Sequence, residues 1–164
     1  MKPVRICFVC LGNICRSPTS EGVMAHLLEQ QGLADQVELD SAGTGGWHIG
    51  DPPDRRSAAT ARQRGMDLFG HSRQFKEIDF DRFDFIVAMD RSNLRALRNM
   101  AANETDIAKL SLLRSFDPTA PPMAEVPDPY YGGPNGFDEV LDICIRGCEG
   151  MIRHLQERDL LQKS

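Results

Sequence analysis

Long apolar runs are missing from the sequence, and with them the main sign of a membrane protein. No stretch approaches the roughly 18 consecutive apolar residues that a membrane-spanning helix needs. The charged opening segment has no long apolar region behind it, which argues against a secretory signal. Repeats and low-complexity segments are absent as well. A chain of 164 residues, 41% hydrophobic and 26% charged, therefore predicts a single globular domain over residues 1–164.

Clusters of positive charge are also lacking. The arginines are scattered, the lysines form no run, and the formal net charge is −5 at pH 7. Nucleic acids and anionic membrane surfaces attract concentrated basic charge, so we expect neither of them as the main partner.

Cysteine and histidine are both sparse. The five cysteines form an odd set without the spacing of a disulfide framework, which favours a reducing, cytoplasmic location. The four histidines share no close spacing with one another or with the cysteines. The sequence thus contains no metal-binding motif, and we expect its chemistry to need neither a metal nor another cofactor.

Segments typical of strands alternate with segments typical of helices along the chain. Apolar or alternating runs predict strands at residues 4–9, 37–42, 84–90 and 107–113. Apolar residues at helical spacing predict helices at residues 19–31, 55–64, 91–102 and 137–157. This order predicts an α/β fold with one four-stranded parallel sheet and helices on both faces. Ligands of such folds bind beside the carboxyl ends of the strands.

Two details of the helices bear on function. Cys144 and Cys148 lie within the apolar stripe of the last helix, so we interpret them as core residues rather than as a metal or redox pair. Asp90 directly precedes the helix at 91–102, where a capping role is favoured over a catalytic one.

The most informative segment joins the first strand to the first helix and reads Cys-Leu-Gly-Asn-Ile-Cys-Arg-Ser-Pro at residues 10–18. A tight loop that opens a helix directs backbone N–H groups and the positive end of the helix dipole at one point, which binds anions. The helix end and Arg16 both favour the thiolate form of Cys10, which is the nucleophilic form. Arg16 can also hold two oxygens of a phosphate. The segment therefore predicts a cysteine placed to attack a phosphoryl group.

Three residues shape this loop. Gly12 lets the backbone adopt conformations closed to residues with a Cβ atom. Asn13 tolerates a left-handed conformation better than most residues. The Ser17 hydroxyl can either cap the helix or donate a hydrogen bond to the sulfur of Cys10.

A second informative segment reads Pro-Asp-Pro-Tyr-Tyr-Gly-Gly at residues 127–133. Phosphoryl transfer from a phenol needs an acid to protonate the leaving oxygen, and flanking prolines hold Asp128 on a stiff loop. An exposed turn is the alternative reading. Tyr130 and Tyr131, the two tyrosines of the chain, directly follow and can line a pocket for an aromatic ring.

The string from Val9 to Pro18 resembles the signature of the low-molecular-weight protein tyrosine phosphatases, and the resemblance extends over essentially the whole chain. It implies hydrolysis of phosphotyrosine in proteins, and of small aryl phosphates, through a phosphocysteine formed on Cys10, with inorganic phosphate as product. It places the general acid at Asp128. It also implies that phosphate binds to Leu11, Gly12, Asn13, Ile14, Cys15, Arg16 and Ser17.

The resemblance has three further implications. The loop at residues 43–53 walls the active-site cleft, so Trp47 becomes a stacking partner for a substrate ring. Ser41 and His71 form hydrogen bonds with Asn13 and hold its strained conformation. Cys15 forms a reversible disulfide with the nucleophilic cysteine and switches the enzyme off under oxidation, the alternative being that Cys15 merely packs inside the loop.

Three alternatives to a tyrosine phosphatase remain open on the sequence. A thioredoxin-coupled arsenate reductase uses a similar loop but needs further redox cysteines on a mobile segment. A protein arginine phosphatase has a similar loop with threonine in place of Ile14, and the apolar Ile14 favours an aromatic substrate. A phosphate-sensing module without catalysis would need neither the cysteine nor the aspartate.

Overall fold

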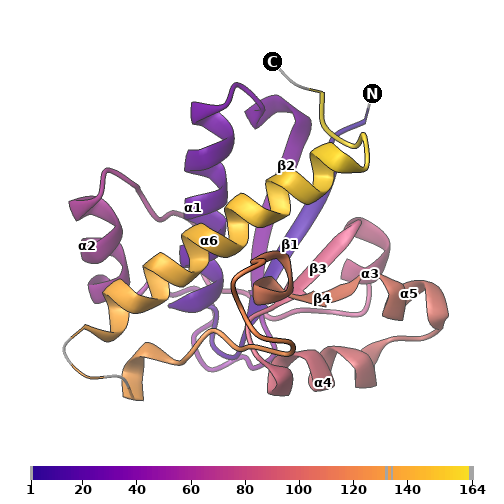
Figure 1. Cartoon of the computed structure of the whole chain (residues 1–164). Coiled ribbons are helices and arrows are strands. Elements are labelled where there is room, and N and C mark those ends of the chain that lie inside the picture. Colours follow the sequence, from indigo (N-terminus) through magenta and orange to yellow (C-terminus); the bar gives the residue numbers. More distant parts are fainter. Residues whose placement is uncertain (1, 132, 134, 163–164) are drawn as a thin grey trace.

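A four-stranded parallel sheet forms the centre of the fold (Figure 1). The computed structural model describes residues 2–131, 133 and 135–162. The strands stand in the order β2-β1-β3-β4. They are β1 (Val4–Cys10), β2 (Val37–Gly43), β3 (Phe85–Ala88) and β4 (Leu110–Leu112). The single-domain α/β fold with an all-parallel sheet, expected from the sequence, is thereby confirmed.

Strand β1 lies inside the sheet and is buried on both faces. Ile6 and Phe8 point into the larger apolar core, whereas Cys7 and Val9 point into the smaller one on the opposite face. The period of two in a strand produces this division. It explains why this strand reads as an almost continuous apolar run.

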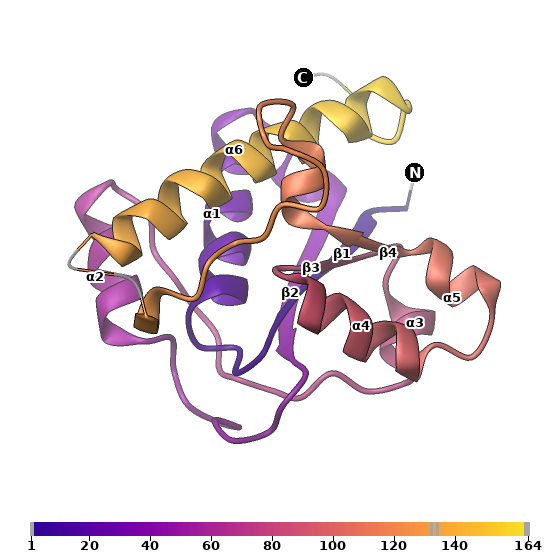
Figure 2. The same cartoon turned by 60° about the horizontal axis from the view of Figure 1, so that its bottom comes forward.

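Helices cover both faces of the sheet (Figure 2). One layer contains α1 (Arg16–Gln30) and α6 (Gly136–Glu157), with α2 (Arg55–Gln63) packed against them. The other face carries α3 (Asp79–Arg82) and α4 (Arg91–Met100), followed by α5 (Glu104–Ala108). Short 3-10 turns lie in some of the connections: η1 (Ala34–Gln36), η2 (Leu113–Phe116) and η3 (Pro129–Tyr131). None of the helices in the described part of the chain combines the length and apolarity needed to span a bilayer.

The two cysteines of α6 are core residues, as their spacing predicts. Cys144 and Cys148 are fully buried beneath α1. Cys144 Sγ lies 3.3 Å from the hydroxyl of Ser20, and burial raises the pKa of this thiol to about 12. Both cysteines are therefore neutral and enclosed, which is the opposite of a redox pair on a mobile segment.

Aspartate side chains cap the starts of two helices. The side chain of Asp54 accepts from the N–H groups of Arg56 and Ser57 and starts α2. The side chain of Asp90 accepts from the N–H of Asn93 over 2.7 Å and starts α4. The predicted capping role of Asp90 is thus confirmed.

Several predicted boundaries differ from the observed ones. The strand predicted at 84–90 is shorter, Phe85–Ala88, and the helix predicted at 91–102 ends at Met100. Two other differences are larger. The first helix begins at Arg16 rather than at residue 19, so Pro18 lies within its first turn, where a missing N–H still removes no intrahelical bond. The last predicted strand is confined to Leu110–Leu112. Residues 104–108 form α5 instead, because the Asn103 side chain accepts from the Asp106 N–H and starts a helical turn there.

Candidate active site

The loop between β1 and α1 closes around the sulfur of Cys10. This residue ends β1 and is 3% exposed. The backbone N–H of Asn13 donates a hydrogen bond to Cys10 Sγ over 3.2 Å. Asn13 has a φ of 58°, which lies in the left-handed region that asparagine adopts more readily than most residues. The loop therefore turns back on the cysteine at the residue where the sequence favours it.

The end of β2 supports this loop from the side. The backbone N–H groups of Thr44 and Gly45 donate to the carbonyl oxygens of Cys10 and Leu11, both over 2.9 Å. A Cβ atom at Gly43 would lie 2.7 Å from the carbonyl oxygen of Leu11. Only glycine permits so close an approach of the two backbones.

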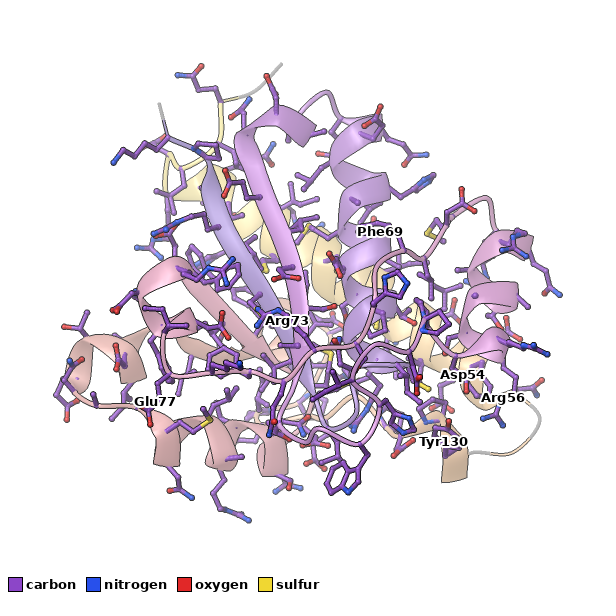
Figure 3. The ribbon with its side chains drawn as sticks, turned by 180° about the vertical axis from the view of Figure 1, so that it is seen from behind. Asp54, Arg56, Phe69, Arg73, Glu77 and Tyr130 are labelled. Atoms are coloured by element: carbon purple, nitrogen blue, oxygen red, sulfur yellow. The ribbon has the colours of Figure 1, made fainter. Side chains whose placement is uncertain are left out.

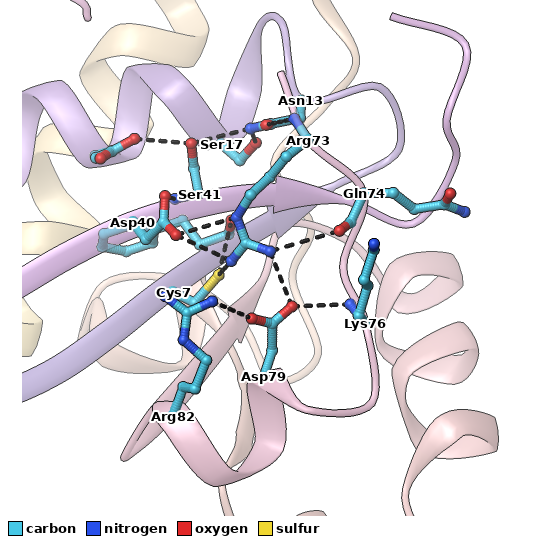
Figure 4. A network of polar contacts seen from close by, with 12 residues as sticks. Cys7, Asn13, Ser17, Asp40, Ser41, Arg73, Gln74, Lys76, Asp79 and Arg82 are labelled. Carbon is cyan, nitrogen blue, oxygen red and sulfur yellow. Dashed lines mark hydrogen bonds and ion pairs between the residues drawn. The ribbon is translucent and has the colours of Figure 1, made fainter. Parts of the chain in front are cut away.

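The side-chain amide of Asn13 organises the loop from inside (Figure 4). The backbone N–H of Arg73 donates to Asn13 Oδ1 over 3.0 Å, and because a backbone N–H can only donate, this contact fixes which way the amide faces. Asn13 Nδ2 donates to the hydroxyl oxygens of Ser17 and Ser41 over 2.8 and 2.9 Å. Ser17 Oγ lies 3.0 Å from Cys10 Sγ. Since Ser17 already accepts from Asn13, its own proton is available to the sulfur, where it stabilises a thiolate.

Glu21 terminates this chain of hydrogen bonds. The hydroxyl of Ser41 donates to Glu21 Oε1 over 2.7 Å, and the glutamate is 7% exposed. Burial, helped by the negative charge of Asp40, raises the pKa of Glu21 from 4.5 to about 7 against the opposing effects of the Ser41 hydrogen bond and of Arg73. A carboxyl group that changes protonation near neutral pH therefore lies at the far end of the network from the cysteine.

Arg16 begins α1 and is held from behind. Its Nη1 donates to Asp90 Oδ2 over 2.7 Å and to the carbonyl oxygen of Val126 over 3.0 Å. Burial disfavours its charge, but the negative charges of Cys10 and Asp90 outweigh that effect, so the pKa of Arg16 is raised. The guanidinium group thus stays positive beside the loop amides, at the place where an anion would bind.

A cavity of about 210 Å³ opens over this loop. Asp128, which belongs to a distant part of the chain, lines the cavity together with Cys10 and Arg16. Asp128 Oδ1 accepts from the backbone N–H of Tyr130 over 3.0 Å, which fixes the orientation of the carboxyl group. Among the residues that the structure describes, the lining comprises Cys10, Leu11, Gly12, Ile14, Cys15, Arg16, Trp47, His48, Asp128 and Tyr130.

Aromatic side chains stand at the mouth of the cavity. Trp47 is 74% exposed and Tyr130 is 48% exposed, so large apolar surfaces face solvent beside the loop. The sequence singles out both residues as cleft walls, and both line the cavity. The side chain of Tyr131, the third predicted wall, lies outside the described residues.

Comparison with known proteins agrees with this geometry. The family described as "Low molecular weight phosphotyrosine protein phosphatase" matches residues 5–161. The chain belongs to this family. A low molecular weight protein-tyrosine-phosphatase of Streptomyces coelicolor is 48% identical over 155 residues, which cover 94% of each chain. The protein is thus an enzyme, a low-molecular-weight protein-tyrosine-phosphatase.

Solved structures of related phosphatases have the same fold. The crystal structure of YfkJ from Bacillus subtilis is 39% identical and superposes with a TM-score of 0.89, covering 96% of this chain and 98% of that one. A Drosophila arginine phosphatase is 33% identical, with a TM-score of 0.84 and coverage of 95% and 98%.

The second cysteine of the phosphate-binding loop is a buried thiol with a raised pKa. Cys15 is 5% exposed. Burial, helped by the negative charges of Asp54 and Cys10, raises the pKa of the Cys15 thiol to about 12, although a hydrogen bond with Ser57 opposes this effect. Cys15 is therefore a neutral thiol at physiological pH.

One predicted supporting contact is missing. Ser41 bonds to Asn13 as expected, but His71 is exposed and forms no hydrogen bond with Asn13 in the described part of the chain. Asn13 Oδ1 accepts from the backbone of Arg73 instead. The reason is that Gln74 forms a β-bridge with Gly43. This bridge holds the backbone of the neighbouring Arg73, rather than the ring of His71, against the phosphate-binding loop.

The sequence does not predict a role in the site for Glu21, His48 or Asp90. Glu21 lies in the middle of a helical pattern, and His48 lies in a loop in which only the tryptophan suggests a function. Asp90 is interpreted as a helix cap alone. The Asp90 contact with Arg16 joins residues 74 positions apart, and no local pattern reports it. Among the described residues, no group of three or more histidine, cysteine or acidic side chains could hold a metal ion.

Proposed function

We propose that this phosphatase hydrolyses phosphotyrosine in proteins, and small aryl phosphates, through a phosphocysteine intermediate. The observation that supports the proposal most directly is the meeting of Cys10, Arg16 and Asp128 around one cavity. A binding site alone needs an anion cradle and a cation. A nucleophilic cysteine and a carboxylic acid facing the same space indicate group transfer.

The first step forms the phosphocysteine. The Cys10 thiolate attacks phosphorus in line with the departing phenol, while the loop amides and Arg16 stabilise the equatorial oxygens. Asp128 donates its proton to the phenol oxygen as the phosphorus–oxygen bond breaks. The products are a phosphocysteine and a neutral phenol, with Asp128 left as a carboxylate.

The second step releases phosphate. The Asp128 carboxylate takes a proton from a water molecule, whose oxygen attacks the phosphorus of the phosphocysteine. The sulfur–phosphorus bond breaks and Cys10 leaves as a thiolate, which the hydroxyl of Ser17 stabilises at 3.0 Å. Inorganic phosphate departs, and Asp128 is again protonated for the next cycle.

The residues at the mouth of the cavity indicate which substrates it binds. Trp47 and Tyr130 offer aromatic faces to the ring of a phosphotyrosine, and Tyr131 follows in the same loop. We infer that tyrosine-phosphorylated proteins are the substrates and that neither nucleic acid nor membrane is a partner. The five cysteines are all free, which supports work in the reducing cytoplasm.

Two substitutions test the mechanism. Replacing the nucleophile, Cys10→Ser, should abolish turnover of phenyl phosphate. Asp128→Ala should slow it by roughly 10²–10⁴-fold while phosphate still binds. Activity should persist in excess chelator, since no step uses a metal. A near-wild-type rate for either variant would overturn the assignment.

Cys15 is proposed as a redox partner of Cys10. Peroxide would oxidise Cys10 to a sulfenic acid, and the Cys15 sulfur would then displace water to form a disulfide; overall, the two thiols lose two electrons and the peroxide becomes two waters. The raised pKa of Cys15, about 12, makes this capture slow. Mass spectrometry after mild peroxide treatment checks the proposal: without a Cys10–Cys15 cross-link, Cys15 is a packing residue.

Phosphoarginine is the second candidate substrate, because a solved arginine phosphatase has the same fold. The apolar Ile14 and the aromatic walls favour phosphotyrosine over a charged guanidinium group. The ratio of kcat/KM for phosphotyrosine and phosphoarginine peptides decides between them.

A further inference from the structure

The loop that carries Asp128 is tied to the rest of the site by one tyrosine. The backbone N–H of Tyr130 donates to Asp128 Oδ1 over 3.0 Å. The phenol of the same residue donates to Asp54 Oδ2 over 3.1 Å, on a different segment of the chain (Figure 3). Tyr130 therefore holds the carboxyl group with its backbone and is itself held by its side chain.

Asp54 is fixed to the phosphate-binding loop. Its backbone N–H donates to the carbonyl oxygen of Ile14 over 2.7 Å. Its Oδ1 accepts from the N–H groups of Arg56 and Ser57 as the cap of α2, which leaves Oδ2 to Tyr130 and Arg56. Burial favours the neutral acid, but the hydrogen bonds from Arg56 and Tyr130 outweigh it and lower the pKa of Asp54. The acceptor is thus an ionised carboxylate whose two oxygens both accept hydrogen bonds.

Arg56 closes the arrangement from outside. Its guanidinium carbon lies 4.7 Å from the ring centroid of Tyr130 and 4.7 Å from that of Phe137, near the start of α6. The side chain is 55% exposed, so its ion pair with Asp54 is screened by solvent and contributes little energy. Its effect is geometric, because it stacks on the ring that must keep its place.

We propose that Asp54 is a positioning residue that sets the location of Asp128 over Cys10, acting through the phenol of Tyr130. The proposal rests on the function proposed above, in which Asp128 is the acid. Each link is a single hydrogen bond: Ile14 to Asp54, Asp54 to Tyr130, and Tyr130 to Asp128. A continuous chain of hydrogen bonds thereby joins the nucleophile's loop to the acid's loop.

Dependence on the leaving group distinguishes this role from general support of the fold. A poor leaving group such as phenol needs the proton from Asp128, whereas 2,4-dinitrophenolate departs without one. Displacing the carboxyl group of Asp128 therefore slows the hydrolysis of phenyl phosphate and leaves the hydrolysis of 2,4-dinitrophenyl phosphate nearly unchanged. Distortion of the phosphate-binding loop would slow both substrates, because both need the same nucleophile and the same amides.

The experiment measures kcat/KM of the full chain for both substrates, since this ratio reports the first chemical step. Tyr130→Phe removes only the hydroxyl, and Asp54→Ser keeps a capping oxygen while withdrawing the acceptor. For each variant we expect about a 10-fold loss on phenyl phosphate, part of the roughly 10²–10⁴-fold that a placed acid supplies, and less than about a 2-fold loss on the dinitrophenyl ester. Asp142→Ser is the matched control, because Asp142 also pairs with an arginine, Arg64, outside the site.

A second measurement repeats Tyr130→Phe in an Asp128→Ala background. If Tyr130 acts only through Asp128, removing its hydroxyl causes no further loss once Asp128 is absent. The kcat/KM of the double variant for phenyl phosphate then stays within about 2-fold of that of Asp128→Ala alone. A multiplicative loss, or an equal loss on both substrates in the first experiment, overturns the positioning role. If Asp128→Ala alone leaves phenyl phosphate turnover unchanged, the proposed function itself is wrong, and the two failures are thus distinguishable.

Discussion

At the scale of single residues, Asn13 determines how the hydrogen bonds of the loop are directed. Its amide can face only one way because Arg73 presents a backbone N–H. Both of its own hydrogens then go to serine hydroxyls, and the proton of Ser17 is directed at the sulfur of Cys10. The hydrogen bond between Asn13 and Arg73, which lie 60 positions apart in sequence, thus decides which groups stabilise the thiolate.

Ser17→Ala tests this direction of hydrogen bonding. The variant removes the hydroxyl that donates to Cys10 Sγ and leaves Asn13 with one unused hydrogen. We expect the rate of alkylation of Cys10 by iodoacetate at pH 6 to fall by about 10-fold, the equivalent of one charge-assisted hydrogen bond. Thr60→Ala, which removes an exposed hydroxyl on α2, serves as control. An unchanged alkylation rate for Ser17→Ala would contradict the inferred direction.

Glu21 gives the fold a pH dependence of known sign. Its pKa is about 7 in the folded protein against 4.5 ordinarily, so the unfolded chain releases this proton more readily. The free energy of unfolding therefore falls as pH rises from 4.5 to 7, by at most about 3 kcal/mol from this group. Glu21→Gln should lose this part of the pH dependence.

Urea denaturation at pH 5 and pH 8 checks the Glu21 prediction. The stability difference between the two pH values should be smaller in Glu21→Gln than in the parent protein. Glu29→Gln provides the comparison, because Glu29 is exposed on the same helix. Equal pH dependence in all three proteins would mean that Glu21 ionises normally.

At the scale of elements, α6 illustrates how packing reverses an intrinsic preference. Glycine inside a helix is less favourable than alanine by about 1 kcal/mol, so the sequence alone suggests that Gly150→Ala would stabilise α6. A Cβ atom at Gly150 would, however, lie 1.9 Å from the carbonyl oxygen of Phe116 in η2. The glycine is present because the backbone of another element passes directly against the helix.

We therefore expect Gly150→Ala to destabilise the protein. Relieving the contact requires a shift of backbone rather than of a side chain, which costs about 2 kcal/mol or more. The free energy of unfolding from urea titration measures the loss. Glu149→Ala, at an exposed neighbouring position, should change it by less than about 0.5 kcal/mol. A stabilised Gly150→Ala would show that η2 moves freely against α6.

At the scale of the whole molecule, the sheet order creates the site. β1 pairs with β2 on one side and with β3 on the other, so the chain leaves the end of β1 at a point where neighbouring connections diverge. The loop after β1, the segment after β2 and the segment that carries Asp128 meet there. The cavity is therefore a consequence of topology, and its ligand binds to the folded state alone.

Inorganic phosphate should stabilise the molecule by mass action. At a concentration 100 times its Kd, a ligand of the native state adds about 2.7 kcal/mol to the free energy of unfolding. We expect Tm to rise with phosphate concentration in the parent protein and in Asp128→Ala, which keeps the cradle. Arg16→Lys loses bidentate binding and should show a much smaller rise. An equal rise in Arg16→Lys would place the phosphate elsewhere.

The sequence by itself determined the local parts of this protein. The strand–loop–helix unit around Cys10, the cap at Asp90 and the apolar stripe of α6 all depend on residues a few positions apart. Side-chain period and capping chemistry act over that same distance, so they can be read without coordinates. The family resemblance added the roles of Ser41 and Asp128. It also suggested a hydrogen bond between His71 and Asn13, but the backbone N–H of Arg73 donates to Asn13 instead.

Only the tertiary structure decided the contacts that turn these parts into a site. The pairing of Arg16 with Asp90, the burial of Glu21 and the hydrogen bond from Tyr130 to Asp54 join segments brought together by strand order and helix packing. Such contacts depend on which segments become neighbours in space, and that depends on the sum of many weak packing interactions over the whole chain. No periodicity within one segment encodes its partner in another.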